Sequence, residues 1–298
     1  MKTQNTNIMK RIYSLPAIGL LLSFLLANLI ANGQTHFTVN VTGKGKPMIL
    51  IHGLYCTGEV WKETVAHYQD RYECHVVTLA GFGGNAPALS DHFMEDVKND
   101  LVAYVKEKKL KKPVIMGHSM GGFLSFWTAA SAPDLFEKVI AVDGLPFLSV
   151  LQSPGATGES MKPMAENMKA AMAKQTPEQI KSNQLRILAS MISSSDRVAQ
   201  VAEIASKADP ATQAEVMYEM FTTDLRPQVA AIQSPVLLLG AWSAYKDYGA
   251  THDGSLAAYQ AQVSNIKNAK VAINDTAKHF IFYDEPAWFF ETVDGFLK

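Results

Sequence analysis

A single serine stands in the stretch Gly117-His-Ser-Met-Gly121, and its neighbours indicate a nucleophile. Residues 112–119 read as a buried apolar strand, and residues 120–132 have helical spacing that stops before Pro133. A glycine-x-serine-x-glycine motif between a strand and a helix is the pattern of a nucleophile elbow, a sharp turn that exposes the hydroxyl. The N-terminus of the following helix favours developing negative charge. This context predicts that Ser119 attacks a carbonyl carbon rather than merely filling a tight turn.

Apolar strands alternate with amphipathic helices on both sides of this motif. Such alternation predicts an α/β fold, with a mostly parallel central sheet and helices on both of its faces. From residue 145 to residue 230 the alternation stops, and the chain is mostly helical and rich in methionine. We therefore expect the sheet domain to comprise residues 34–144 and 231–298, with residues 145–230 inserted as a helical cap or lid. The expected strands cover residues 36–41, 48–53, 74–84, 112–119, 138–144, 234–242 and 269–275.

These motifs resemble the α/β-hydrolase family over nearly the whole chain after the N-terminal segment. The resemblance is carried by "HGLYCTGEVW" (52–61), "AGFGGNAP" (80–87), "GHSMGG" (117–122) and "AKHF" (277–280). It implies a serine hydrolase in which the helical insertion is a cap domain. It also implies that a general base follows the last strand and that an acid lies between the serine and that base.

His279 is the expected general base, because a serine nucleophile needs a base within hydrogen-bond reach. This residue follows the last expected strand, where the resembled family carries its base, and it matches the chain order serine, acid, histidine. His252 is the competing candidate. His118 adjoins the serine, but we expect its side chain to point away from the hydroxyl and to pack. His52 ends a strand and is expected to shape the turn that binds the oxyanion.

Three carboxylates could orient the imidazole ring of the base and stabilise its charged form. The resemblance places the acid shortly after the next-to-last strand, where Ser243 occupies the position at which aspartate is common. Asp247 is the first carboxylate beyond it and is our first choice. Asp143, one strand earlier, and Asp253 are the alternatives. All three lie between the nucleophile and the base, so chain order does not separate them.

Backbone N–H groups are expected to bind the oxyanion that forms during acyl transfer. One belongs to Met120, directly after the nucleophile, and the other to Leu54, in the loop after residues 48–53. The sequence has no metalloprotease, EF-hand or paired Cys-x-x-Cys motif, no phosphate-binding loop and no dinucleotide-binding glycine pattern, so we expect neither metal nor cofactor. Cys56 and Cys74 could form a bridge or remain separate thiols.

The net charge and the N-terminal segment indicate which partners and which cellular location to expect. The chain has 27 Lys and Arg against 28 Asp and Glu, without the basic surplus of nucleic-acid-binding proteins. Residues 1–33 combine a charged start, an apolar run and the small residues Ala31 and Gly33, the pattern of a secretory signal peptide. We expect cleavage near Gly33 and a periplasmic or secreted protein without stable membrane insertion. The alternative is a membrane anchor formed by the uncleaved segment.

These residues predict an exported serine hydrolase that cleaves an ester or related acyl bond through an acyl-enzyme intermediate. We expect a small-molecule acyl substrate, and the methionines and aromatic side chains of residues 145–230 favour an apolar one. Two alternatives stay open. The same triad could hydrolyse an amide, a lactone or a carbon–carbon bond or carry out perhydrolysis, or the chain could be a hydrolase-like binding protein without catalysis.

Overall fold

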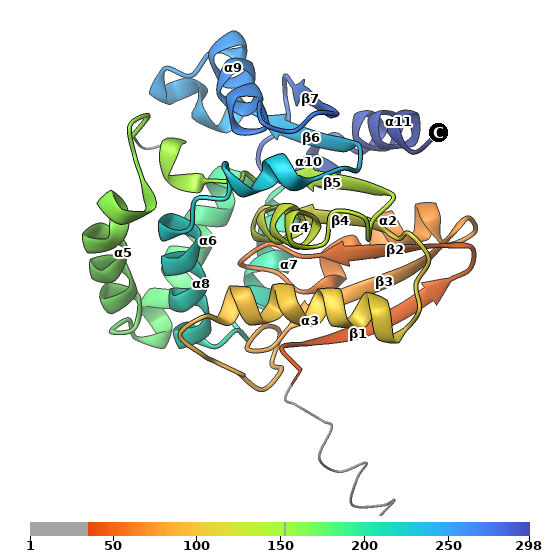
Figure 1. Ribbon diagram of the computed structural model, residues 1–298. Helices are drawn as coiled ribbons and strands as arrows, with labels where there is room; N and C mark the ends of the chain where they lie inside the picture. Colours follow the sequence, from red (N-terminus) through yellow and green to blue (C-terminus); the bar gives the residue numbers. More distant parts are fainter. Residues whose placement is uncertain (1–34, 152) are drawn as a thin grey trace, which may run out of the picture. The chain divides into compact units, whose positions relative to one another are not determined.

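A seven-stranded sheet lies at the centre of the structure, a computed structural model that describes residues 35–151 and 153–298 (Figure 1). The strand order is β1-β3-β2-β4-β5-β6-β7, in which β1 pairs antiparallel with β3 and all other neighbours pair in parallel. The predicted α/β class with a mostly parallel sheet is therefore confirmed. The strands are β1 (Phe37–Gly43), β2 (Lys46–Ile51), β3 (Tyr72–Leu79), β4 (Val114–His118), β5 (Lys138–Val142), β6 (Val236–Ala241) and β7 (Ala269–Asn274).

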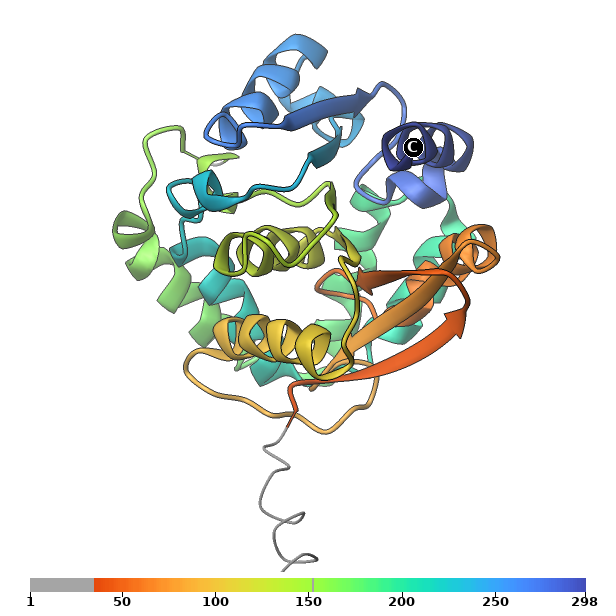
Figure 2. The ribbon, with the colours of Figure 1, turned by 45° about the vertical axis from the view of Figure 1, so that its right-hand side comes forward.

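Successive side chains of a strand point to opposite faces of the sheet. Because the central strands are apolar on both faces, helices cover both. In β2, Ile49 and Ile51 belong to one buried cluster, whereas Met48 and Leu50 belong to the other. Buried side chains of α3, α4 and α9 belong to the first cluster, and those of α2, α10 and α11 belong to the second. Figures 1 and 2 show the backbones of these helices around the sheet. These helices are α2 (Lys62–Tyr68), α3 (Phe93–Glu107), α4 (Met120–Ser131), α9 (His252–Gln262), α10 (Ile281–Asp284) and α11 (Pro286–Leu297).

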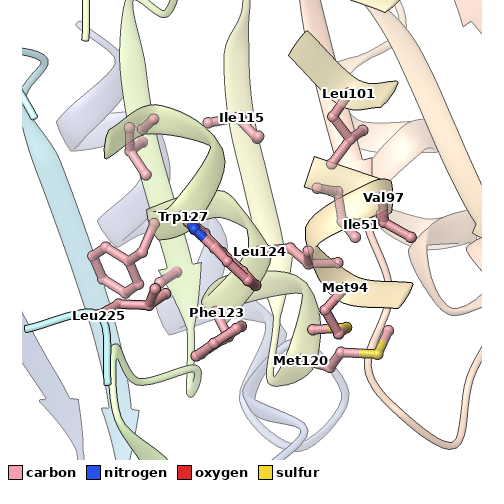
Figure 3. Close-up of a cluster of buried hydrophobic side chains, with 14 of the residues drawn as sticks. Ile51, Met94, Val97, Leu101, Ile115, Met120, Phe123, Leu124, Trp127 and Leu225 are labelled. Atoms are coloured by element: carbon pink, nitrogen blue, oxygen red, sulfur yellow. The ribbon is translucent and has the colours of Figure 1, made fainter. Parts of the chain in front are cut away.

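Helix α4 follows the candidate nucleophile and is buried along most of its length. Its side chains Phe123, Leu124 and Trp127 lie in one cluster with Met94 and Val97 of α3 (Figure 3). A helix packed in this way cannot shift without opening the core, since protein interiors are close-packed. The turn that precedes α4 therefore has a rigid support.

Helices α5 to α8 lie between β5 and β6, in the segment predicted to be a cap, and are called the inserted helices below. Helix α5 packs against α8, and α6 packs against α7. Residues His36–Lys298 form one compact unit. That the inserted helices form a separate cap domain or lid stays a prediction. The inserted helices are α5 (Gly158–Met172), α6 (Pro177–Met191), α7 (Ser195–Ala205) and α8 (Pro210–Thr222); the short 3-10 helices are η1 (Gly58–Trp61), η2 (Leu148–Leu151), η3 (Gln228–Ala231) and η4 (Ser243–Tyr248).

The expectation of export concerns the two cysteines, any membrane-spanning helix and the N-terminal segment. Cys56 and Cys74 are both buried and both free, so the thiols are separate rather than bridged. Within the described residues, no helix is long and apolar enough to cross a membrane. The predicted signal peptide, residues 1–33, lies outside the part of the chain that the structure describes.

His52 fixes the loop that follows β2. Its buried ring bonds through Nδ1 to the Gly53 carbonyl oxygen at 2.7 Å and through Nε2 to the Leu79 backbone nitrogen at 3.1 Å. The Leu79 N–H can only donate, so Nε2 accepts and Nδ1 carries the proton. Burial lowers the pKa of His52 to about 4. A neutral imidazole therefore connects the ends of β2 and β3.

The core packing predicts a large stability difference between two leucine substitutions. Leu50→Ala removes a fully buried side chain from a central strand and should lower the free energy of unfolding by about 2–5 kcal/mol, through lost apolar burial and a residual cavity. Leu185→Ala, at a leucine 39% exposed on α6, should change it by about 0.5 kcal/mol or less. Urea unfolding followed by circular dichroism measures both. Equal losses in the two variants would contradict the described packing.

The buried His52 also predicts acid sensitivity. Its folded pKa of about 4 lies below the ordinary value of 6.5, so between these values only the unfolded chain gains the proton. This group should therefore lower the free energy of unfolding as the pH falls from 6.5 towards 4, by up to about 3 kcal/mol. Nitrogen NMR of the imidazole should report a neutral ring with the proton on Nδ1 from pH 6.5 down to about 5, one unit above its folded pKa. A His52 ring that becomes charged near pH 6.5 would refute the assignment.

Candidate active site

Loops after four parallel strands meet at the carboxyl edge of the sheet. Gly53 and Leu54 follow β2, Ser119 follows β4, Asp143 follows β5, and His279 follows β7. The carboxyl ends of parallel strands lie on the same edge, which is where ligands bind in open α/β sheets. All five residues line one cavity of about 110 Å³. The structure thus brings the predicted nucleophile, base and oxyanion loop together.

Ser119 occupies a sharp turn between β4 and α4. Its backbone has φ 53° and ψ −116°, and its N–H donates to the Val142 carbonyl oxygen at 2.9 Å. A non-glycine residue with positive φ is uncommon and costs strain that the surrounding structure must offset. A side chain at Gly117 would collide with the backbone of Gly121, and one at Gly121 would collide with the Ile51 carbonyl group. Both glycines are therefore required for this turn, the geometry expected of a nucleophile elbow.

The buried carboxylate of Asp143 pairs with the partly buried ring of His279. The ring donates from Nδ1 to Asp143 Oδ2 at 2.5 Å, and the carboxylate side chain is only 3% exposed. Oδ1 of the same carboxylate accepts from the Ala241 backbone nitrogen at 3.1 Å and from the Tyr259 hydroxyl at 2.5 Å. Since the proton lies on Nδ1, Nε2 is left as the basic nitrogen of the ring.

The structure places Asp143, rather than Asp247, against His279. Asp247 lies exposed in η4, and Asp253 lies exposed at the start of α9, where its carboxylate pairs with His252 at 3.0 Å. Our first choice of acid is not supported by this geometry, because Asp247 faces solvent while a buried carboxylate already holds the ring. Asp143 takes its place as the proposed acid.

Ser243 stands where the family resemblance led us to look for an acid, and it has a different role here. Its hydroxyl lies 2.9 Å from the Thr276 carbonyl oxygen and 3.0 Å from that of Ala277. Both carbonyl groups belong to the loop that carries His279. The serine therefore anchors the backbone of this loop instead of orienting the imidazole ring.

Tyr259 is a site residue that the sequence did not reveal. Burial and the charge of Asp143 raise the pKa of its hydroxyl well above the ordinary range, so the group stays protonated and donates to the carboxylate. In the sequence it reads as one more core side chain of an amphipathic helix. The one signal is Gly240, where an added side chain would collide with the tyrosine ring.

His118 packs as expected, and it also holds the backbone of the base. Its ring lies against Phe280 and Phe282, and its Nε2 donates to the His279 carbonyl oxygen at 3.1 Å. Burial, together with the nearby ring of His279, lowers the pKa of His118 well below 6.5. The ring is therefore neutral, with its proton on Nε2, and Nδ1 has no partner among the described residues.

The predicted oxyanion donors lie beside the nucleophile. Met120 is the first residue of α4, so its N–H has no partner within the helix, and Leu54 lines the same cavity as Ser119.

Within the described residues, Ser119 Oγ does not form a hydrogen bond to His279; such catalytic contacts are often loose before substrate binds. In residues 35–151 and 153–298, no cluster of three or more His, Cys, Asp or Glu side chains could hold a metal ion.

The inserted helices supply an apolar wall to the cavity. Leu148 of η2, Met191 of α6, and Met217 and Met220 of α8 all line it. Methionine side chains adapt to ligands of different shapes. Ser119 therefore lies beside a largely apolar wall, and charges in such surroundings interact more strongly than they do in water.

Comparisons with known proteins fit this geometry. The pimeloyl-[acyl-carrier protein] methyl ester esterase of Aliivibrio salmonicida is 33% identical over 104 residues, which is 35% of this chain and 38% of that protein. The match thus spans well under half of the relative. The enol-lactonase from Burkholderia xenovorans LB400 superposes with a TM-score of 0.70 at 18% identity, covering 88% of this chain and 96% of the other.

A thermophilic esterase from Thermogutta terrifontis superposes with a TM-score of 0.68 at 21% identity, covering 88% of this chain and 92% of the other. At such identities the structural likeness establishes the fold alone. The alpha/beta hydrolase fold family matches residues 46–286, which is most of the chain. With its parallel sheet and the serine turn after β4, this chain belongs to the alpha/beta hydrolase fold family.

Proposed function

We propose that this protein is a serine hydrolase that cleaves a carboxylic ester through Ser119, His279 and Asp143. The observation that carries the proposal is the 2.5 Å hydrogen bond from His279 Nδ1 to the buried Asp143, in a cavity that also contains Ser119. An oriented imidazole beside a serine on a nucleophile elbow supports acyl transfer, and it speaks against a non-catalytic binding protein.

The reaction follows from the positions of these groups. His279 Nε2 takes the proton of Ser119 as Oγ attacks the ester carbonyl, and Asp143 stabilises the imidazolium that results. The backbone N–H groups of Leu54 and Met120 bind the oxyanion. His279 then protonates the leaving alcohol, and the acyl group remains on Ser119 Oγ. A water molecule activated by His279 finally releases the acid.

An apolar acyl substrate fits the lining of the cavity, which includes Leu148, Met217 and Met220. The methyl ester esterase from A. salmonicida, by its name, supports ester cleavage over the other bond types. We propose export as well, on the grounds of the charged start and apolar run in residues 1–33.

Loss of the nucleophile tests the proposed reaction. Ser119→Ala should reduce hydrolysis of p-nitrophenyl butyrate by roughly 10⁴-fold or more, because no acyl-enzyme can form. The unmodified protein should also react covalently with a fluorophosphonate probe, located at Ser119 by peptide mass spectrometry. Ser264→Ala, at an exposed serine, is the matched control and should keep both properties. An unlabelled Ser119 in folded protein, or full activity of Ser119→Ala, would overturn the proposal.

The identity of the acid is tested by paired substitutions. Asp143→Asn should lower kcat by roughly 10⁴-fold, since an amide no longer stabilises the imidazolium or enforces the tautomer. Asp247→Asn should leave kcat within about twofold, because that side chain is exposed. Circular dichroism checks that both variants fold. A larger loss in Asp247→Asn than in Asp143→Asn would restore our first choice from the sequence.

A further inference from the structure

A second cavity, of about 460 Å³, adjoins the cavity at Ser119. It is bounded by the end of β6, by η4, by residues 249–251 and by the first two turns of α9. We call it the α9 cavity. Leu151, Tyr245 and Tyr259 line both cavities, so a molecule held at Ser119 can extend into the α9 cavity past these three side chains.

The cavity at Ser119 is too small to hold a large substrate by itself. Its volume is about 110 Å³, whereas pockets for small-molecule ligands usually span roughly 300–1,000 Å³. The α9 cavity lies within that range. Leu151 and Tyr245, at the junction of the two cavities, are each 45% exposed, so a ligand can reach both side chains from solvent. The α9 cavity therefore supplies space that the cavity at Ser119 lacks.

The wall of the α9 cavity carries no charge among the described residues. The charged neighbours Lys246, Asp247 and Asp253 are exposed and do not line it. A charged group placed in this cavity would lose water without gaining an ion-pair partner, which is costly. The wall therefore favours an uncharged ligand.

Small residues form half of the wall and leave it wide. A side chain added at Gly249 would meet nothing within 4 Å, and one added at Gly254 would meet only Thr251 Oγ1, at 3.0 Å. The cavity therefore has room for a group broader than a single methylene chain. The small residues are Ala241, Gly249, Ala250, Gly254 and Ala258.

The large side chains of the wall are apolar or aromatic. They are Leu151 and the rings of Tyr245 and Tyr259. Aromatic rings pair edge to face or offset, and such pairs gain more than the burial of their area alone provides. An aromatic ring of a ligand therefore finds better partners in this cavity than an alkyl chain does.

Four hydroxyl groups complete the wall, and none of them supplies a counter-charge. The Tyr259 hydroxyl donates to Asp143, and Thr251 Oγ1 accepts from a backbone N–H of α9 at 3.1 Å. The hydroxyls of Tyr245 and Ser255 form no hydrogen bond within the described residues. Tyr245 is exposed and Ser255 is half-buried, so both can bind water or a neutral oxygen atom of a ligand.

We propose that the α9 cavity binds one arm of the ester substrate and that this arm carries an uncharged aromatic ring. The ring lies against Tyr245 and Leu151 at the junction and fills the space over Gly254 and Ala258. A straight alkyl chain leaves part of that space empty, and a carboxylate on the ring has no positive partner. The inference deepens the hydrolase function proposed for Ser119 and rests on it.

Binding to the Ser119→Ala protein tests this inference without turnover. The probes are methyl esters of straight-chain acids of increasing length. The far end of each chain carries a phenyl ring, a 4-carboxyphenyl ring or an n-hexyl group, which has as many carbons as phenyl. At one length the phenyl probe should bind at least about fivefold more tightly than the other two, by calorimetry. A reversed series, acetate esters of alcohols with the same three ends, identifies which arm enters.

Two substitutions separate the α9 cavity from general apolar binding. Ala258→Trp fills the cavity from an exposed position of α9, and Tyr245→Ala removes the ring at the junction. Each, in the Ser119→Ala protein, should reduce the preference for phenyl over n-hexyl about threefold or more. Ala257→Trp, at the adjacent exposed position that does not line the cavity, is the matched control and should keep the preference. Circular dichroism checks that the variants fold.

Three outcomes would overturn the inference. They are a preference unchanged in both cavity variants, no phenyl preference in either series, and equal binding of the phenyl and 4-carboxyphenyl probes.

Hydrolysis of methyl acetate by the unmodified protein, followed by titration of the released acid, keeps the two proposals distinct. Neither arm of methyl acetate is long enough to reach the α9 cavity. Methyl acetate hydrolysis without any phenyl preference removes the α9 site and leaves the hydrolase. Phenyl-selective binding by the Ser119→Ala protein, together with no hydrolysis of any ester and no fluorophosphonate labelling of the unmodified protein, removes the proposed function instead.

Discussion

The carboxylate of Asp143 is the constraint around which the site is built. It is buried, so its oxygens must be paired. Its partners come from three other parts of the fold: the Ala241 N–H at the end of β6, the Tyr259 hydroxyl on α9, and the His279 ring after β7. Backbone φ at Asp143 is 49°, a conformation that aspartate tolerates better than most residues. One side chain thereby fixes the relative positions of a strand end, a helix and the loop that carries His279.

His279 is held from its backbone as well as from its ring. His118 Nε2 donates to the His279 carbonyl oxygen, and Ser243 bonds the loop two and three residues earlier. His118 is the last residue of β4 and directly precedes Ser119. The strand that leads into Ser119 therefore also positions His279. Preorganisation of this kind supports catalysis, because misplacement of reacting groups by even about 1 Å is costly.

The sequence was a good guide where the signal is local. The elbow at Ser119 requires two glycines, an apolar strand and a helix within about twenty residues, and each has its own pattern. The parallel sheet followed from the same rhythm of strands and helices, whereas the choice of His279 also needed the resemblance to the hydrolase family. The inserted helices were also visible, because the strand pattern stops there.

The carboxylate that pairs with His279 could not be chosen in this way, because its identity depends on contacts between segments that are distant in sequence. Asp143 and Asp247 both follow apolar strands and both precede His279, so order and spacing favour neither. What separates them is that Asp143 accepts from Ala241, at the end of the adjacent strand β6, and from Tyr259, whereas Asp247 lies in an exposed 3-10 helix. The Nδ1 atom of His118, which has no partner among the described residues, raises the same difficulty. A buried donor or acceptor without a partner has no signature in a sequence, and it becomes visible only when every neighbour is in place.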